Sequence, residues 1–372
     1  MTQTVRLVRF ADVVAAAQDA ETFASRTSKH LHVPNGMDGE EHRAYRAIVD
    51  RQMTPGIVAD LQAQFDDTAA EVVGQLPLGV AFDAVGELGE VFAVRAQCRW
   101  LGWPSALERE LREWMARNYA AAGQHDPERN SAVAADFDAI VSRQISEHRA
   151  ARESGEHGPD ATCRLLDERI DGRPLTDEEL VSILRNWTAG DLGSLARCVG
   201  VVVHRLAERP RWQRRMRTLA QGIHRGENDS RGENDSRGED DSIGEFDAIL
   251  GECLRIDDPF VANRRVATCP ASTPSGERID EGSIVLLDWV AANRDPDVFS
   301  DGFDPQRHAE HNLVFGIGPH VCPGRDLSYA ELRAVIVALL EETTLIEAAP
   351  GRHPIRHDPP LGGWATVPIV LS

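Results

Sequence analysis

The chain has 372 residues, of which 60 are acidic, 40 are basic and 42% are apolar, so it can bury a large core. A formal net charge of −20 makes the chain as a whole a poor binder of nucleic acids and anionic membranes, because both are polyanions. No run approaches the roughly 20 apolar residues of a membrane helix, and residues 1–10 lack a secretory leader, so we expect a cytoplasmic protein.

Apolar residues at helical spacing predict helices over most of the first half of the chain. The predicted ranges are 13–23, 40–53, 56–76, 84–102, 105–120 and 131–152, followed by a linker at 153–161. The most informative helix starts at Thr176, where Thr176-Asp-Glu-Glu179 forms a capping box, and runs to about Leu206, before Pro210. Because it is apolar on more than one side, we expect this helix to lie through the core.

An acidic repeat occupies residues 225–247, where RGENDS occurs at 225–230 and 231–236 and RGEDDS at 237–242. With almost no apolar side chains it cannot bury itself, which predicts a solvated or disordered insertion. Beyond it, 283–287 and 365–371 are predicted strands and 327–342 an amphipathic helix. Residues 288–326 are predicted to be a long ordered coil, and a coil of that length inside a compact domain usually has a function.

The six cysteines, at positions 98, 163, 198, 253, 269 and 322, include no CxxC pair. Their scatter argues against a disulfide framework and against a structural zinc site, so most are expected to be small buried hydrophobic residues. Cys322 differs, because it lies in the glycine-rich stretch Phe315–Gly324, just before the predicted helix. Glycines there let the backbone approach a flat ligand, and the helix N-terminus would stabilise a thiolate. The alternative is a free buried cysteine in a turn; a dinucleotide site is excluded, since position 321 is Val.

The segment Phe315-Gly-Ile-Gly-Pro-His-Val-Cys-Pro-Gly324 resembles the haem-binding loop of the cytochrome P-450 superfamily, F-G-x-G-x-H-x-C-x-G. The resemblance implies haem b as cofactor, with Cys322 as the proximal thiolate ligand of its iron. His320 would hydrogen-bond a haem propionate, Phe315 would pack beside the thiolate, and Gly316 and Gly324 would shape the loop.

Further motifs of the superfamily occur in the expected order. Glu252-Cys-Leu-Arg255 resembles the ExxR motif and Phe303-Asp-Pro-Gln-Arg307 the FxPxR segment, so Glu252, Arg255 and Arg307 would form a buried structural ion network. On their own, these charges would be read as surface residues. His42 and Arg46 match the HxxxR pair, and Arg265 matches an arginine that binds the second propionate through its planar fork.

The long helix departs from the superfamily pattern A/G-G-x-D/E-T, whose acid and alcohol deliver protons to iron-bound oxygen. Here Ala189-Gly190 is followed by Asp191, and Leu192 and Gly193 stand at the acid and alcohol positions. Asp191 and Ser194 are three residues apart and could bracket a water above the iron. The alternative is that Asp191 satisfies backbone groups at a kink beside Gly190.

The resemblance implies a mainly helical fold with a small β-sheet, the triangular prism of cytochrome P-450, as a single domain over 1–372 that is short at its N-terminus. It implies a bacterial monooxygenase that oxidises a small organic molecule with O2 and electrons from a separate ferredoxin and reductase, by hydroxylation, O-dealkylation or oxidative coupling. Arg43, Arg51 and Arg325 could dock an acidic ferredoxin or could simply be solvated. The alternatives are a haem enzyme that uses peroxide and a non-catalytic haem sensor.

Overall fold

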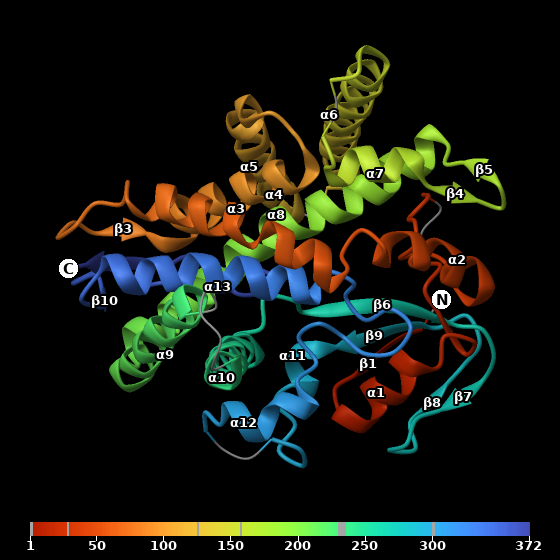
Figure 1. Ribbon diagram of the computed structural model, residues 1–372. Coiled ribbons are helices and arrows are strands. Elements are labelled where there is room, and N and C mark those ends of the chain that lie inside the picture. The colour runs from red at the N-terminus through yellow and green to blue at the C-terminus, as the bar shows by residue number, and fades with distance from the viewer. Residues whose placement is uncertain (1–2, 28–29, 125, 157, 230–235, 300–301) are drawn as a thin grey trace.

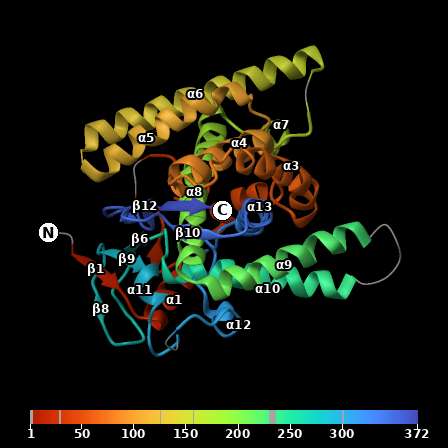
Figure 2. The same cartoon turned by 90° about the vertical axis from the view of Figure 1, so that its left-hand side faces the viewer.

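The computed structural model describes residues 3–27, 30–124, 126–156, 158–229, 236–299 and 302–372. Its helical part is built around α8 (Asp177–Glu208), which Figure 2 shows passing between the α5–α6 pair and the α9–α10 pair. The capping box predicted at its start is present: the Thr176 hydroxyl accepts from the backbone of Glu179, whose carboxylate accepts from the backbone of Thr176. The apolar side chains of α8 are buried on more than one side of the helix, as expected for a helix that lies through the core.

The predicted helices all form, with shifted ends. They are α1 (Phe10–Gln18), α2 (Gly39–Asp50), α3 (Pro55–Val73), η1 (Ala84–Gly89) leading into α4 (Glu90–Leu101), α5 (Glu108–Gln124) and α6 (Pro127–Ser154). The C-terminal amphipathic helix is α13 (Arg325–Glu342), which packs on α3, while α4 packs on α8. These four helices, α3, α4, α8 and α13, form the central bundle (Figure 1).

The main sheet joins the N-terminal segment to strands from residues 262–288. Its four strands lie in the order β1-β9-β6-β2, with β1 (Thr4–Leu7) parallel to β9 (Ile284–Asp288). β6 (Ala262–Ala267) is antiparallel to β9 and to β2 (Phe23–Ala24). β1 was not among the predicted strands, because its alternation of polar and apolar residues covers only four positions, too few to identify a strand. Helix α1 packs against this sheet, which lies below the bundle in Figure 1.

The C-terminal strands are short. β10 (Ile346–Ala348), β13 (Pro368–Leu371) and β3 (Phe82–Asp83) form a three-stranded sheet, and β11 (Ile355–Arg356) pairs with β12 (Trp364–Thr366). Two further pairs are β4 (Arg169–Ile170) with β5 (Arg173–Pro174) and β7 (Ala271–Ser272) with β8 (Arg278–Ile279). The remaining helices are η2 (Ser105–Leu107), α7 (Ala161–Asp167), α9 (Pro210–Asp229), α10 (Ser236–Ile256), α11 (Trp289–Ala292), α12 (Pro305–His308) and η3 (Ala309–His311).

The acidic repeat is not wholly irregular, in contrast to the prediction for 225–247. α9 continues to Asp229 and α10 begins at Ser236, so helices enter the repeat from both sides, and residues 230–235 lie outside the described chain. The two helices pack on each other, which favours their extension into a segment that has few apolar side chains. In the part of the chain that the structure describes, no helix has the length and apolar character needed to cross a bilayer.

Candidate functional site

A cavity of about 420 Å³ lies where α8, the loop 312–324 and the main sheet meet. It brings together most of the residues that the sequence singled out. Among the residues that line it are Asp191, Ser194, Arg265, Phe315, Gly316, His320, Cys322 and Gly324. Aromatic side chains complete its walls, namely Trp100, Trp187, Phe260 and Trp289. The cavity therefore has a thiol, a histidine and an arginine set among large apolar surfaces.

The loop is held in shape by its glycines and by one main-chain bond. Gly316 and Gly318 have φ values of +71° and +79°, a region that strongly favours glycine. A Cβ on Gly318 would lie only 2.6 Å from the carbonyl oxygen of Ala17, so the loop also needs glycine there to approach α1. The backbone N–H of Cys322 donates to the carbonyl of Phe315 at 2.8 Å, which turns the cysteine into the cavity.

Cys322 itself is not held as a thiolate by the protein alone. Burial raises the pKa of its thiol to about 11, and the nearby carboxyl of Asp191 adds to this rise. The backbone N–H of Gly324 and the charge of Arg46 act in the opposite direction but are weaker than burial. The backbone at the start of the helix therefore lowers the pKa of Cys322, as predicted, but by less than burial raises it. A thiolate at this position needs a cation as its partner.

The far end of the cavity is polar. His320 Nε2 lies 2.9 Å from the hydroxyl of Ser25 and 3.3 Å from Asp38 Oδ1, and its ring is 4.2 Å from that of His42. Burial lowers the pKa of His320 to about 4, so the ring is neutral near pH 7. Arg265 is 7% exposed, and the hydrogen bond described for its guanidinium goes to the main-chain oxygen of Arg264.

Arg46 faces the cysteine loop, as His42 does through the ring of His320, in keeping with their spacing. Its NH1 group donates to the carbonyls of Pro319 and Val321, at 3.0 and 2.7 Å, and its Nε donates to Asp50 at 2.6 Å. Arg46 thus ties α2 to the cysteine loop, because carbonyls of a tight turn need donors that the turn cannot supply. No local motif predicted a role for Asp38 or Ser25, because their contacts with His320 depend on how distant segments of the chain pack.

Asp191 faces the cavity and also the helical bundle. One of its carboxyl oxygens accepts a hydrogen bond from Gln97 of α4, and burial raises the pKa of Asp191 to about 7. Glu331 of α13 is completely buried, and neither of its carboxyl oxygens has a hydrogen-bond partner among the described residues. Burial and the charge of Asp191 raise the pKa of Glu331 well above its ordinary value, so the two carboxyls share at least one proton near pH 7.

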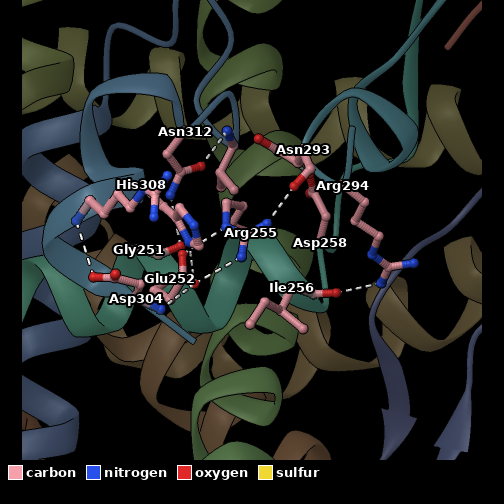
Figure 3. A network of polar contacts seen from close by, with 12 residues as sticks. Gly251, Glu252, Arg255, Ile256, Asp258, Asn293, Arg294, Asp304, His308 and Asn312 are labelled. Atoms are coloured by element: carbon pink, nitrogen blue, oxygen red, sulfur yellow. Dashed lines mark hydrogen bonds and ion pairs between the residues drawn. The ribbon is translucent and has the colours of Figure 1, made fainter. Parts of the chain in front are cut away.

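The ExxR motif forms the expected buried network, with one member exchanged (Figure 3). Arg255 Nε donates to Glu252 at 2.7 Å, and its NH1 group donates to the carbonyl of Asn293 at 2.5 Å. The third side chain on Glu252 is His308, whose Nδ1 lies 2.8 Å from Oε1, whereas Arg307 is exposed. The prediction that Arg307 completes the triad is therefore wrong in this structure, because α12 turns His308 inward and Arg307 outward.

The described residues fit the haem expected from the sequence. Glycine backbone and aromatic rings offer flat surfaces, and Cys322 offers a sulfur ligand. The buried guanidinium of Arg265, which lines the same cavity, has no ion pair among the described residues and so suits a carboxylate such as a propionate.

Comparison with known proteins agrees with this chemistry. The family described as "Cytochrome P450" matches residues 119–367. The chain is 26% identical over 361 residues to cyclomarin C epoxidase CymV of Salinispora arenicola, covering 93% of this chain and 85% of that protein. It is 27% identical over 350 residues to the erythromycin C-12 hydroxylase of Saccharopolyspora erythraea, covering 89% and 80%.

Solved structures show the same fold. A post-tailoring hydroxylase (HmtN) involved in himastatin biosynthesis superposes with a TM-score of 0.80 at 23% identity, covering 99% of this chain and 90% of that one. A mutant of P450 EryK in complex with erythromycin B gives a TM-score of 0.82 at 24% identity, covering 98% and 90%. The mainly helical fold with small sheets is thus confirmed.

Proposed function

The chain belongs to the cytochrome P450 family, a family of haem monooxygenases, and from this we propose that it uses haem b to oxidise a small organic molecule by hydroxylation, O-dealkylation or oxidative coupling. The observation that carries the proposal is that Cys322, Arg265 and His320 line one cavity. A thiol together with carboxylate-binding groups in one cavity is what an iron porphyrin with two propionates requires.

In this proposal each residue has a stated task. Cys322 would ligate the iron, and the bound haem would supply the redox centre that reacts with O2. Arg265, His320 and His42 would hold the propionates, and Phe315 would pack beside the sulfur. Arg46 would keep the loop in place through the carbonyls of Pro319 and Val321, so that the sulfur stays aimed at the cavity.

Protons would come from Asp191, assisted by Ser194. Both side chains line the cavity, and burial raises the pKa of Asp191 to about 7, so part of the population carries a proton near neutral pH. Gln97 holds one carboxyl oxygen toward the bundle and leaves the other for a water in the cavity. Glu331, behind Asp191, would return the proton.

Electrons would come from a ferredoxin and its reductase. Arg43 and Arg325 are exposed on α2 and α13, the helices nearest the cysteine loop, and could meet an acidic partner. Arg51 is less available than the sequence suggested, because it forms a two-pronged ion pair with Glu168, with distances of 3.1 and 2.6 Å.

A second candidate, oxidation with peroxide, is favoured by one observation. Leu192 and Gly193 stand where the superfamily has its acid and alcohol, so the usual proton donors are missing from those positions. Hydrogen peroxide already carries the protons and both oxygen atoms, so an enzyme that uses it depends less on side chains that deliver protons.

One experiment separates the two. An absorbance screen of the ferric protein with small aromatics, terpenes and cyclic peptides identifies a compound that displaces water from iron. Its turnover is then measured with ferredoxin and reductase, and with hydrogen peroxide, for the wild type, Asp191→Ala and Ser194→Ala. We expect ferredoxin-driven turnover of Asp191→Ala to fall about 100-fold while peroxide-driven turnover stays within about twofold. Unchanged ferredoxin-driven rate and coupling would remove the proton role of both residues.

A further inference from the structure

Arg197, a buried arginine of α8, has no ion-pair partner among the described residues. The helix carries three arginines, and two of them are paired: Arg185 with Asp138 at 2.9 Å and Arg205 with Asp257 at 2.8 Å. Arg197, between them, is only 7% exposed, and it forms no ion pair with any described residue. Because a buried cation without an anion is costly, its survival in the core calls for a compensating ligand.

The groups around Arg197 are neutral hydrogen-bond donors. The hydroxyl of Tyr119, from α5, is buried, and neither this hydroxyl nor Nε of Arg197 has an acceptor among the described residues. Burial raises the pKa of Tyr119 to about 12, so the phenol stays protonated. The ring of His357, before β12, contacts that of Tyr119 at a tilt of 52°, with centroids 5.4 Å apart, and burial and Arg197 lower the pKa of His357 to about 4. Its neighbour Asp358 is exposed and does not pair with Arg197.

These groups lie next to residues that line the cavity. Asn186, which lines it, shares one strip of α8 with Gly193 and Arg197, at i, i+7 and i+11. A Cβ on Gly193 would lie 3.0 Å from the Tyr119 hydroxyl and 3.2 Å from Arg197 NH1, so the absence of a side chain there is what admits both groups. Ser194, another lining residue, is three positions before Arg197, about 4.5 Å along the helix axis.

We infer that Arg197, together with the Tyr119 hydroxyl, anchors a carboxylate of the substrate, so that the enzyme prefers small organic acids over neutral molecules of the same shape. A carboxylate would accept from the guanidinium and from the phenol, and so satisfy both groups that lack acceptors. The rest of a molecule about one aromatic ring long would then lie over the Cys322 cavity. The inference rests on the proposed function, because it names the substrate class of that site.

The test compares acids with their uncharged isosteres on the haem-loaded protein. Benzoate, phenylacetate and 3-phenylpropanoate are each titrated against the corresponding primary amide by calorimetry and by absorbance at pH 7.5. The proteins are the wild type, Arg197→Met, Tyr119→Phe and a control, Arg205→Met, which removes the paired arginine of the same helix. A normal ferrous carbonyl spectrum in each variant shows that the haem site is intact, which separates failure of this inference from failure of the proposed function.

We expect at least one acid to bind the wild type and Arg205→Met at least tenfold more tightly than its amide, and this ratio to fall to about one in Arg197→Met. Tyr119→Phe should reduce the ratio by a smaller factor. Without ligand, Arg197→Met should unfold at a higher temperature than the wild type, because an uncompensated buried charge is removed. Equal binding of acids and amides, no binding of any acid, or a lower unfolding temperature for Arg197→Met would overturn the inference.

Discussion

Asp191 and Glu331 place two carboxyl groups in the core; Gln97 donates to Asp191, and neither carboxyl oxygen of Glu331 has a hydrogen-bond partner among the described residues. The folded chain binds a proton on Asp191 more tightly than the unfolded chain, since its pKa rises from 3.8 to about 7. Between these values the folded state holds more protons than the unfolded state. The contribution of Asp191 to the free energy of unfolding therefore falls as pH rises from about 4 to about 7.

Asp191→Asn should remove this dependence. We expect the variant to gain stability relative to the wild type at pH 8 and to gain much less at pH 5, as measured by urea unfolding at both values. Glu178→Gln removes the charge of an exposed carboxyl on the same helix and serves as the control for the loss of a surface charge. A pH-independent difference for Asp191→Asn would show that its carboxyl is solvated and not buried against the bundle.

Single residues also mark the limit of what the sequence could predict at the site. Cys322 and His320 follow from a motif, because the loop that carries them is continuous in the chain, and Arg265 follows from a separate match in β6. Gln97 and Glu331 lie 94 and 140 positions from Asp191, and nothing in their local sequence signals a shared cluster. Such contacts are decided by how α4, α8 and α13 pack.

Among the elements, α8 was predicted well because its start carries a local signal, the Thr176–Glu179 capping box, and its length follows from a continuous apolar pattern. The elements around 288–324 were predicted poorly. α11 and α12 have four residues each, too few for a periodic pattern, and they depend on caps from Asp288 and Asp304. That short helix α12 is why the third contact to Glu252 comes from His308.

The exchange within this network gives a direct test. Glu252→Gln should lower the free energy of unfolding by about 3–5 kcal/mol, because it leaves Arg255 charged, buried and unpaired. His308→Ala should cost about 1.5–3 kcal/mol, the value of a hydrogen bond to a charged group. Arg307→Ala should stay within about 0.5 kcal/mol, as for most exposed side chains. A loss for Arg307→Ala as large as that for Glu252→Gln, in urea unfolding, would restore Arg307 to the network.

At the scale of the whole molecule, the fold class followed from ordered motifs, while the topology did not. Strand β1 pairs with β9 across about 280 residues, and β3 pairs with β13 at the other end of the molecule. Two- to four-residue strands carry too little pattern to reveal their partners. These pairings matter to function because β6, which carries Arg265, is paired with β9 and β2.

The account as a whole depends on Cys322 as the ligand of a haem iron. The most direct measurement is the absorbance spectrum of the reduced, carbon monoxide-bound protein for the wild type, Cys322→Ser and Cys198→Ser, whose cysteine is buried in the same core. We expect the wild type and Cys198→Ser to show the strongly red-shifted Soret band of thiolate ligation and Cys322→Ser to lose it. The same band in Cys322→Ser, or its absence from a haem-loaded wild type, would contradict the assignment.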